Sequence, residues 1–192
     1  MRHDPRPAAL DRGTRVEVRE LFARIPARRK FLRTAATEVS RIQAAITRYS
    51  FAYPSVRFKL TVDGSEALTT SGSGDLRETV SSVYGAKTAA EMLDISKNEP
   101  EGVEEVTVSG LIGPASLARA NRANISLYVN GRWVQSRMLG YALEQAYQGF
   151  LMERRYPTAI VHVRLPADQV DVNIHPAKAE VRFTGESRVF SA

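Results

Sequence analysis

Lys178 is the residue whose surroundings in the sequence most favour a chemical role. It lies in the stretch DVNIHPAKAEVRF, residues 171–183, soon after His175-Pro176. Proline has no amide to donate to a sheet and disfavours helix in the residue before it, so the chain should break there. The alternation at 180–183 then indicates a second short strand. A lysine in a loop between two strands is a point charge suited to a terminal phosphate, although an ordinary exposed lysine fits the same spacing.

The sequence contains no complete catalytic set. The three histidines, His3, His162 and His175, are far apart and cysteine is absent, so we expect no metal site. The carboxylates are scattered without the spacing of metal ligands or of an acid–base pair. His175 alone is typical of a packed or turn histidine rather than a base. Trp133 and the tyrosines fall at core spacing, which disfavours stacking platforms for bases.

A glycine-rich stretch, SGSGDLRETVSSVYG at 71–85, resembles a phosphate-binding loop only in its glycines. The Gly-Lys-Ser or Gly-Lys-Thr sequence that such a loop requires does not follow. Asp75 and Glu78 are three residues apart, which predicts a capping box that opens a short helix.

The positive charge is concentrated at one end of the chain. Residues 1–33 hold ten Lys and Arg against four Asp and Glu, whereas the other 159 residues hold seventeen of each. Arg28, Arg29 and Lys30 form the densest group. Such a stretch is either a solvated face or a patch that neutralises nucleic-acid phosphates.

Composition narrows the class of protein. The 192 residues suffice for one large domain or one and a half small ones with a real core. No apolar run is long enough to cross a bilayer, and the polar, basic N-terminus is unlike a signal peptide. The absence of cysteine excludes a disulfide scaffold and suits a reducing cytoplasm, which is where we expect the protein.

Strands and helices alternate along the first half of the chain. Alternating residues predict a strand at 14–19, and apolar residues at helical spacing predict a helix at 34–49. A hairpin is indicated by the alternation that leads into Asp63-Gly64.

The last third is more regular. Asn130-Gly131 predicts a hairpin turn between strands at 125–129 and 132–134. A strand is expected at about 158–165, and a helix at 136–151 should bury Leu139, Leu143, Tyr147 and Phe150. This mixture predicts an α+β fold in which helices cover one mixed sheet.

Three long motifs, in this order and at about this spacing, resemble the MutL family of DNA mismatch repair proteins. They are GTRVEVRELFARIPARRKFL, ISLYVNGRWVQSR and DVNIHPAKAEVRF. The resemblance covers roughly 13–183. It implies an ATPase of the gyrase, histidine-kinase and MutL type (GHKL), followed by a transducer domain like ribosomal protein S5 domain 2. Residues 1–12 would then be a tail or linker, 13–52 the end of the ATPase subdomain, and 53–192 the transducer domain.

The resemblance also implies roles for single residues. Gly13 and Thr14 match a motif at the adenine side of the ATP pocket, Lys178 matches the lysine that reaches the γ-phosphate, and Asn173 matches a residue that supports it. Arg137 matches a DNA-binding position at the start of a helix, with Arg132 beside it. Arg28, Arg29 and Lys30 could extend that DNA-binding surface.

Several parts of the family's ATPase are missing from this sequence. The family has a helix with Glu and Asn four residues apart, which activate water and hold magnesium, and an Asp-x-Gly-x-Gly turn; neither is found here. We therefore expect a fragment that does not hydrolyse ATP by itself and has no cofactor bound. ATP and Mg²⁺ would bind in the intact parent protein.

The resemblance implies partners as well. They are DNA, a mismatch-recognition protein, and a downstream nuclease or helicase, with a homodimeric parent and a monomeric fragment that does not associate with membranes. The alternative is an RNA-binding or ribosome-associated module of the same fold. The missing Glu and Asn helix argues against a self-sufficient ATP hydrolase, and the transducer half of a type II topoisomerase has a different sequence in its lysine loop.

Overall fold

The computed structural model describes residues 14–96, 106–171 and 180–191. Two compact units divide the chain, residues 1–38 and residues 39–192, and each is described by itself. Helix α2 (Ala35–Ala52) begins in the first unit and ends in the second. The predicted domain boundaries at 12/13 and 52/53 stay predictions.

The first unit contains little regular structure. Its short helix α1 (Pro26–Arg29) has proline in its first turn, where the missing amide costs nothing. The start of α2 is capped: Thr34 Oγ1 accepts a hydrogen bond from the amide of Thr37 at 3.3 Å, and Glu38 Oε1 accepts one from the amide of Arg33 at 3.0 Å. These two bonds explain why the predicted helix begins where it does.

The strand predicted at 14–19 is not formed. Val16 is 82 % and Val18 is 71 % exposed, so the apolar face of the alternating pattern covers no core. A strand exists only where a neighbour accepts its backbone hydrogen bonds, and none of the described residues pairs with this segment. The prediction of a strand here was therefore wrong: the sequence alternates, but no described strand lies beside it to pair with.

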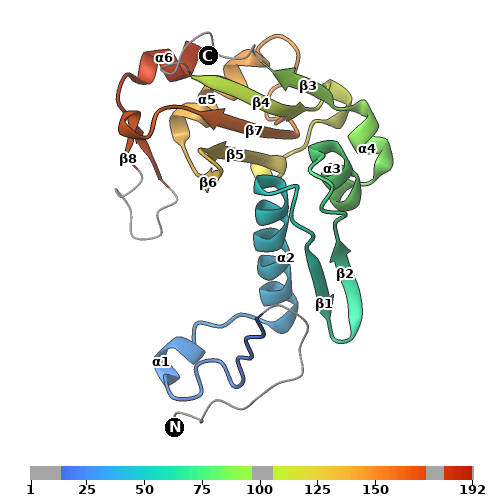
Figure 1. Ribbon diagram of the computed structural model, residues 1–192. Helices are drawn as coiled ribbons and strands as arrows, with labels where there is room; N and C mark the ends of the chain where they lie inside the picture. Colours follow the sequence, from blue (N-terminus) through green and yellow to red (C-terminus); the bar gives the residue numbers. More distant parts are fainter. Residues whose placement is uncertain (1–13, 97–105, 172–179, 192) are drawn as a thin grey trace. The chain divides into compact units, whose positions relative to one another are not determined.

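The second unit is built on a five-stranded sheet with the order β3-β4-β7-β5-β6. The strands are β3 (Leu93–Ser96), β4 (Thr107–Ile112), β5 (Ile125–Val129), β6 (Arg132–Val134) and β7 (Ala159–Arg164). β5 and β7 run parallel, and the other neighbours are antiparallel. The predicted α+β fold with a mixed sheet is therefore confirmed (Figure 1).

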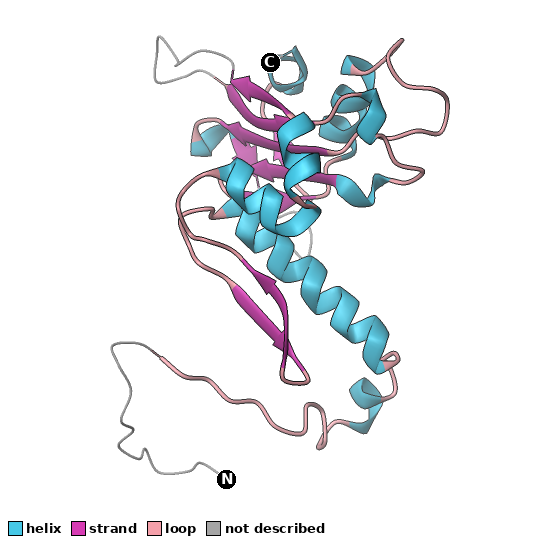
Figure 2. Cartoon of the chain, turned by 90° about the vertical axis from the view of Figure 1, so that its right-hand side faces the viewer, coloured by secondary structure: helices cyan, strands magenta, loops and turns pink. Residues whose placement is uncertain are grey.

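Helices cover both faces of this sheet. On one face the end of α2 and the helices α3 (Leu76–Tyr84) and α4 (Ala86–Glu91) pack a core that includes Phe51, Tyr128 and Ile160. On the other face α5 (Arg137–Ala146) and α6 (Glu186–Ser191) cover Leu127 and Val161. Adjacent residues of a strand point to opposite faces, which is why neighbours in β5 and β7 enter different cores. Figure 2 shows helices in front of the strands.

The remaining elements lie outside the large sheet. β1 (Lys59–Val62) and β2 (Ser65–Thr69) form a separate hairpin, and β8 (Val170–Asp171) pairs with β9 (Arg182–Phe183). Three short 3₁₀ turns are Ala115–Leu117, Arg122–Asn124 and Ala167–Gln169.

Both predicted hairpin turns are confirmed. Asp63-Gly64 and Asn130-Gly131 have positive φ at both positions, as the tightest hairpin turns require. Asn130 contributes more than its backbone, because its amide group accepts from Leu165 N at 3.1 Å and donates to Leu165 O at 3.0 Å. The β5–β6 turn is thereby tied to the end of the neighbouring strand β7.

The helix predicted at 136–151 is shorter than its apolar pattern. α5 ends at Ala146, Phe150 is 74 % exposed, and Tyr147 is half-buried with its hydroxyl donating to Gly113 O at 2.7 Å. Gly149 has φ +85°, a left-handed conformation that ends helices readily. The prediction that Phe150 is buried was therefore wrong, whereas Leu139 is buried as predicted.

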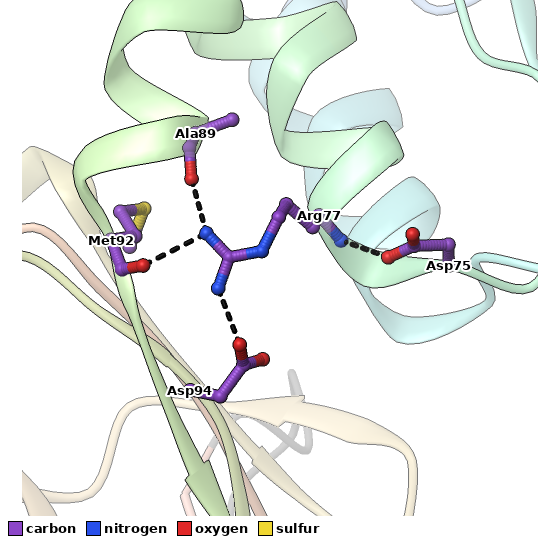
Figure 3. A network of polar contacts seen from close by, with 5 residues as sticks. All are labelled: Asp75, Arg77, Ala89, Met92 and Asp94. Atoms are coloured by element: carbon purple, nitrogen blue, oxygen red, sulfur yellow. Dashed lines mark hydrogen bonds and ion pairs between the residues drawn. The ribbon is translucent and has the colours of Figure 1, made fainter.

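Arg77 joins three elements of the second unit (Figure 3). Asp75 caps α3 by accepting from the amide of Arg77 at 2.7 Å, as predicted for the start of this helix. Glu78 does not complete a capping box with Asp75; it accepts from the hydroxyl of Ser71 at 3.0 Å. The Arg77 guanidinium donates to the carbonyls of Ala89 and Met92, where α4 ends, and to Asp94 of β3.

Candidate nucleic-acid interface

A groove of about 960 Å³ lies in the second unit, between α2, the start of β5, the end of β6 and α5. Three arginines and one glutamate line it, which leaves an excess of two positive charges: Arg48, Arg122, Arg137 and Glu144. The other polar lining groups are hydroxyls and amides. A groove with this composition attracts anions.

Arg137 reaches the groove because of the way α5 begins. Ser136 is the N-cap, and its hydroxyl oxygen accepts from the amide of Leu139 at 3.2 Å. Leu139 is buried against the sheet, so Arg137, the first residue of the helix, is left exposed at the groove. The prediction that its guanidinium projects outward is confirmed.

Arg48 enters the same groove from α2. Its guanidinium carbon lies 3.8 Å from the centre of the Trp133 ring, which is a close cation–π contact. Its carbonyl oxygen accepts from the hydroxyl of buried Tyr128 at 2.9 Å. The guanidinium and the backbone carbonyl of Arg48 are therefore both held by contacts. Figure 1 shows the end of α2 lying against β5 and β6.

Arg122 differs from the other two arginines. Its Nε and one terminal nitrogen donate to the two carboxylate oxygens of Glu144, at 2.7 and 3.0 Å, and its guanidinium lies 4.9 Å from the centre of the Tyr156 ring. The bond to Glu144 raises the pKa of Arg122. The pair is bidentate, so most of the charge of Arg122 is neutralised locally.

Tyr128 is also stacked on His162, its partner across the parallel strands β5 and β7, with ring centres 4.5 Å apart. Burial is the main cause that lowers the pKa of His162 to about 4, and the charge of Arg164 adds to it, whereas a hydrogen bond with the backbone of Phe51 opposes it. His162 is therefore neutral at pH 7.

Acidification should destabilise the second unit through His162. The folded-state pKa of about 4 is below the ordinary 6.5, so the unfolded chain binds the proton more readily. The contribution of neutral His162 to the free energy of unfolding is fully present above about pH 6.5 and is lost as the pH falls toward 4. Between pH 7.5 and pH 5 the free energy of unfolding should fall by about 2 kcal/mol. Urea unfolding at both pH values measures this loss.

His162→Gln is the matched control for that experiment, because glutamine is polar but does not titrate. Its free energy of unfolding should change much less between the two pH values. An equal loss in both proteins would show that other groups cause it.

The second unit matches a known family. Residues 80–192 match the family described as "DNA mismatch repair protein, C-terminal domain". MutL of Clostridium beijerinckii is 37 % identical over 181 residues, and MutL of Geobacillus kaustophilus is 41 % identical over 182 residues. The chain belongs to the MutL family of DNA mismatch repair proteins. The resemblance stated from the three motifs is therefore confirmed.

These alignments cover 94 % and 95 % of this chain but only 27 % and 28 % of the two MutL relatives. The chain thus spans about a quarter of the length of the curated relatives that it matches.

Two solved structures are similar to this chain. The N-terminal domain of a DNA repair protein has a TM-score of 0.71 at 23 % identity, covering 88 % of this chain and 55 % of that one, which shows the shared fold. The Aquifex aeolicus MutL ATPase domain, solved in complex with ADP, has a TM-score of 0.58 at 25 % identity, covering 78 % of this chain and 51 % of that one.

The ATP-site residues implied by the MutL motifs lie mostly outside the described residues. Gly13, Asn173 and Lys178 are among those not described, and Thr14 is exposed on the extended segment that begins the described chain. The two short strands predicted on either side of the Lys178 loop are present as β8 and β9. The roles of all four residues stay predictions.

The DNA-binding residues implied by the MutL motifs fall in both units. Arg137 lines the groove, whereas Arg132 is exposed on β6 and is not one of its lining residues. Arg28, Arg29 and Lys30, at and just after α1, belong to the first unit and are exposed.

Sequence reasoning missed Arg48, Arg122 and Glu144. Arg48 looked like an ordinary charge on the surface of a helix, and nothing near it in the sequence indicates Trp133. Arg122 and Glu144 are also far apart in the chain. Only their meeting in space makes them part of a site.

None of the described helices is both long enough and apolar enough to cross a membrane.

Proposed function

We propose that this MutL-family chain binds the DNA backbone through the groove beside Arg137 and senses the γ-phosphate of ATP through Lys178. Binding at the groove would connect the nucleotide state of the intact protein to its position on DNA. The proposal that the chain binds DNA is supported by the exposed Arg137 at the edge of a groove with an excess of two positive charges.

The composition of the groove supports contacts to phosphate rather than recognition of a sequence. Guanidinium groups bind phosphate oxygens readily, and phosphate contacts carry no base information. Binding should therefore be non-specific and should weaken steeply as the salt concentration rises. One copy of the chain reaches few phosphates, so its affinity should be low.

Arg137→Glu should weaken binding to duplex DNA by about tenfold at about 0.1 M salt, because one phosphate contact is lost. The plot of log affinity against log salt concentration should become shallower by roughly one unit. Fluorescence anisotropy of a labelled duplex, titrated at several salt concentrations, measures both quantities.

Lys87→Glu is a matched control for that substitution. Lys87 is exposed on α4 and does not line the groove, so the same change in charge should leave affinity and slope nearly unaltered. If Arg137→Glu behaved like Lys87→Glu, Arg137 would not be a DNA contact. A strong preference of the chain for structured RNA would instead favour the RNA-binding alternative.

The proposal that Lys178 senses ATP is supported by the motif DVNIHPAKAEVRF and by a similar solved structure. β8 and β9 precede and follow Lys178 in the sequence and pair with each other, and the similar Aquifex aeolicus MutL ATPase domain was solved with ADP. ATP and Mg²⁺ would bind in the intact protein, with Gly13 and Thr14 on the adenine side and Asn173 supporting Lys178. Lys178 itself supplies one positive charge to the terminal phosphate.

In the intact protein, Lys178→Ala should lower the rate of ATP turnover by roughly tenfold, because the charge that develops on the phosphate loses one stabilising cation. The same substitution in the present chain should change the free energy of unfolding by less than about 0.5 kcal/mol. Steady-state phosphate release measures the turnover of the intact protein, and urea unfolding measures the stability of the present chain. Normal turnover in the variant would refute the sensing role.

The remaining proposals concern partners. A mismatch-recognition protein and a downstream nuclease or helicase would act with the intact protein, which would be a homodimer in the cytoplasm that associates with the nucleoid when it acts on DNA. The present chain would be a monomer.

A further inference from the structure

Each aromatic ring that lines the groove contacts another side chain. Arg48 covers a face of Trp133 at 3.8 Å, and Tyr84 is largely buried with its ring centre 5.5 Å from that of Phe51. Burial raises the pKa of Tyr84 to about 12. Tyr141 is stacked on Phe190, with ring centres 6.0 Å apart. Unpaired bases bind proteins by stacking on open aromatic faces, which this arrangement does not favour.

The arginines of the groove, in contrast, are not all neutralised. No described carboxylate lies within 4 Å of the guanidinium nitrogens of Arg48 or Arg137, whereas Arg122 is paired with Glu144. Arg48 and Arg137 can therefore bind an anionic ligand in this groove. Arg122 is already paired with the carboxylate of Glu144.

Arg48 is also the more strongly oriented of these two. Its contact with Trp133 holds the guanidinium against the ring, and its carbonyl oxygen accepts the hydroxyl of Tyr128. Fixing a guanidinium before binding reduces the rotamer entropy that a phosphate contact would cost. Because Arg48 and Arg137 line the same groove, a ligand with several negative charges can contact both.

We propose that the groove is a channel for the phosphodiester backbone, in which Arg48 holds a second phosphate beside the one bound by Arg137. This rests on the proposed function. The channel contacts phosphates and not bases, because Arg48 covers Trp133 and the other two rings, Tyr84 and Tyr141, contact Phe51 and Phe190. Glu144 limits its affinity by neutralising Arg122, so removal of the Glu144 charge creates a third phosphate contact.

Salt-dependent titrations of the 192-residue chain test this proposal, with a labelled thymidine strand and an abasic strand of equal length as probes. The two strands should bind with affinities within about threefold of each other, since a backbone channel does not need bases. A loss of tenfold or more with the abasic strand would overturn the proposal.

Arg48→Met keeps an unbranched side chain over Trp133 and removes the charge together with the guanidinium N–H donors. It should weaken binding about tenfold at about 0.1 M salt and make the log–log slope shallower by about one. Arg48→Lys should keep the slope.

Glu144→Gln should tighten binding and make the log–log slope steeper by up to one, and Lys87→Glu is again the control. Circular dichroism and thermal melting establish that each variant is folded.

The possible failures are distinguishable. If Arg48→Met leaves affinity and slope unchanged while Arg137→Glu weakens binding, the channel is refuted and the proposed function stands. If neither substitution has an effect, both are refuted. If a glutamate-rich peptide of equal charge binds more tightly than the strands and depends on Arg48, the ligand is an acidic protein segment and the nucleic-acid channel is refuted.

Discussion

Gly110→Ala should destabilise the second unit by at least about 3 kcal/mol and leave much of the protein unfolded. Gly110 lies in β4 opposite Val161 of β7, and its φ of +141° is a conformation that residues with a side chain rarely adopt. A Cβ atom there would lie 2.0 Å from the carbonyl oxygen of Ile160. The obstacle is the backbone of a central strand, which cannot move aside without breaking the sheet.

Gly140→Ala is the matched control for this substitution. Gly140 lies within α5, and beyond its own stretch of helix a Cβ atom there would meet no atom within 4 Å. Alanine favours helix over glycine, so this variant should be more stable by up to about 1 kcal/mol. Urea unfolding followed by circular dichroism measures both changes. Equal stabilities for the two variants would mean that β4 and β7 do not approach each other as described.

Arg77→Ala should lower the free energy of unfolding by about 3 kcal/mol. The guanidinium donates to the carbonyl of Ala89 and, at 2.8 Å, to that of Met92, so its loss leaves two acceptors at the end of α4 without their charged donor. Arg77 also joins α3 to β3 through Asp94 (Figure 3). The loss should be visible in thermal melting and in faster amide exchange in α4.

Asp94→Asn separates the two contributions of Arg77. The carboxylate of Asp94 is 75 % exposed, and an exposed ion pair contributes little, so this variant should lose less than about 1 kcal/mol. Arg77→Lys should be intermediate, because an ammonium cannot reach several acceptors in the fork geometry of a guanidinium. An Asp94→Asn variant as unstable as Arg77→Ala would show that the ion pair, and not the capping of α4, is the important contact.

Features that depend on a few adjacent residues could be predicted from the sequence. The Asn130-Gly131 turn, the Asp75 cap and the strands of the last third all follow from local backbone preferences and alternation. The strand predicted at 14–19 is not formed, because a strand requires a second strand to pair with and none of the described residues supplies one. The exposure of Phe150 also escaped prediction, since apolar spacing does not reveal where Gly149 turns the chain.

The MutL family, the α+β fold with its mixed sheet, and the position of Arg137 at the start of a helix could all be inferred from the sequence. Each of the three depends on short contiguous motifs, in which residues close together in the chain determine the local structure. The tertiary structure alone decided which charges share the groove. Trp133 comes to lie under Arg48 and Glu144 opposite Arg122 only when the sheet folds between α2 and α5. Such contacts depend on long-range packing, and residues far apart in the chain carry no local pattern that reveals them.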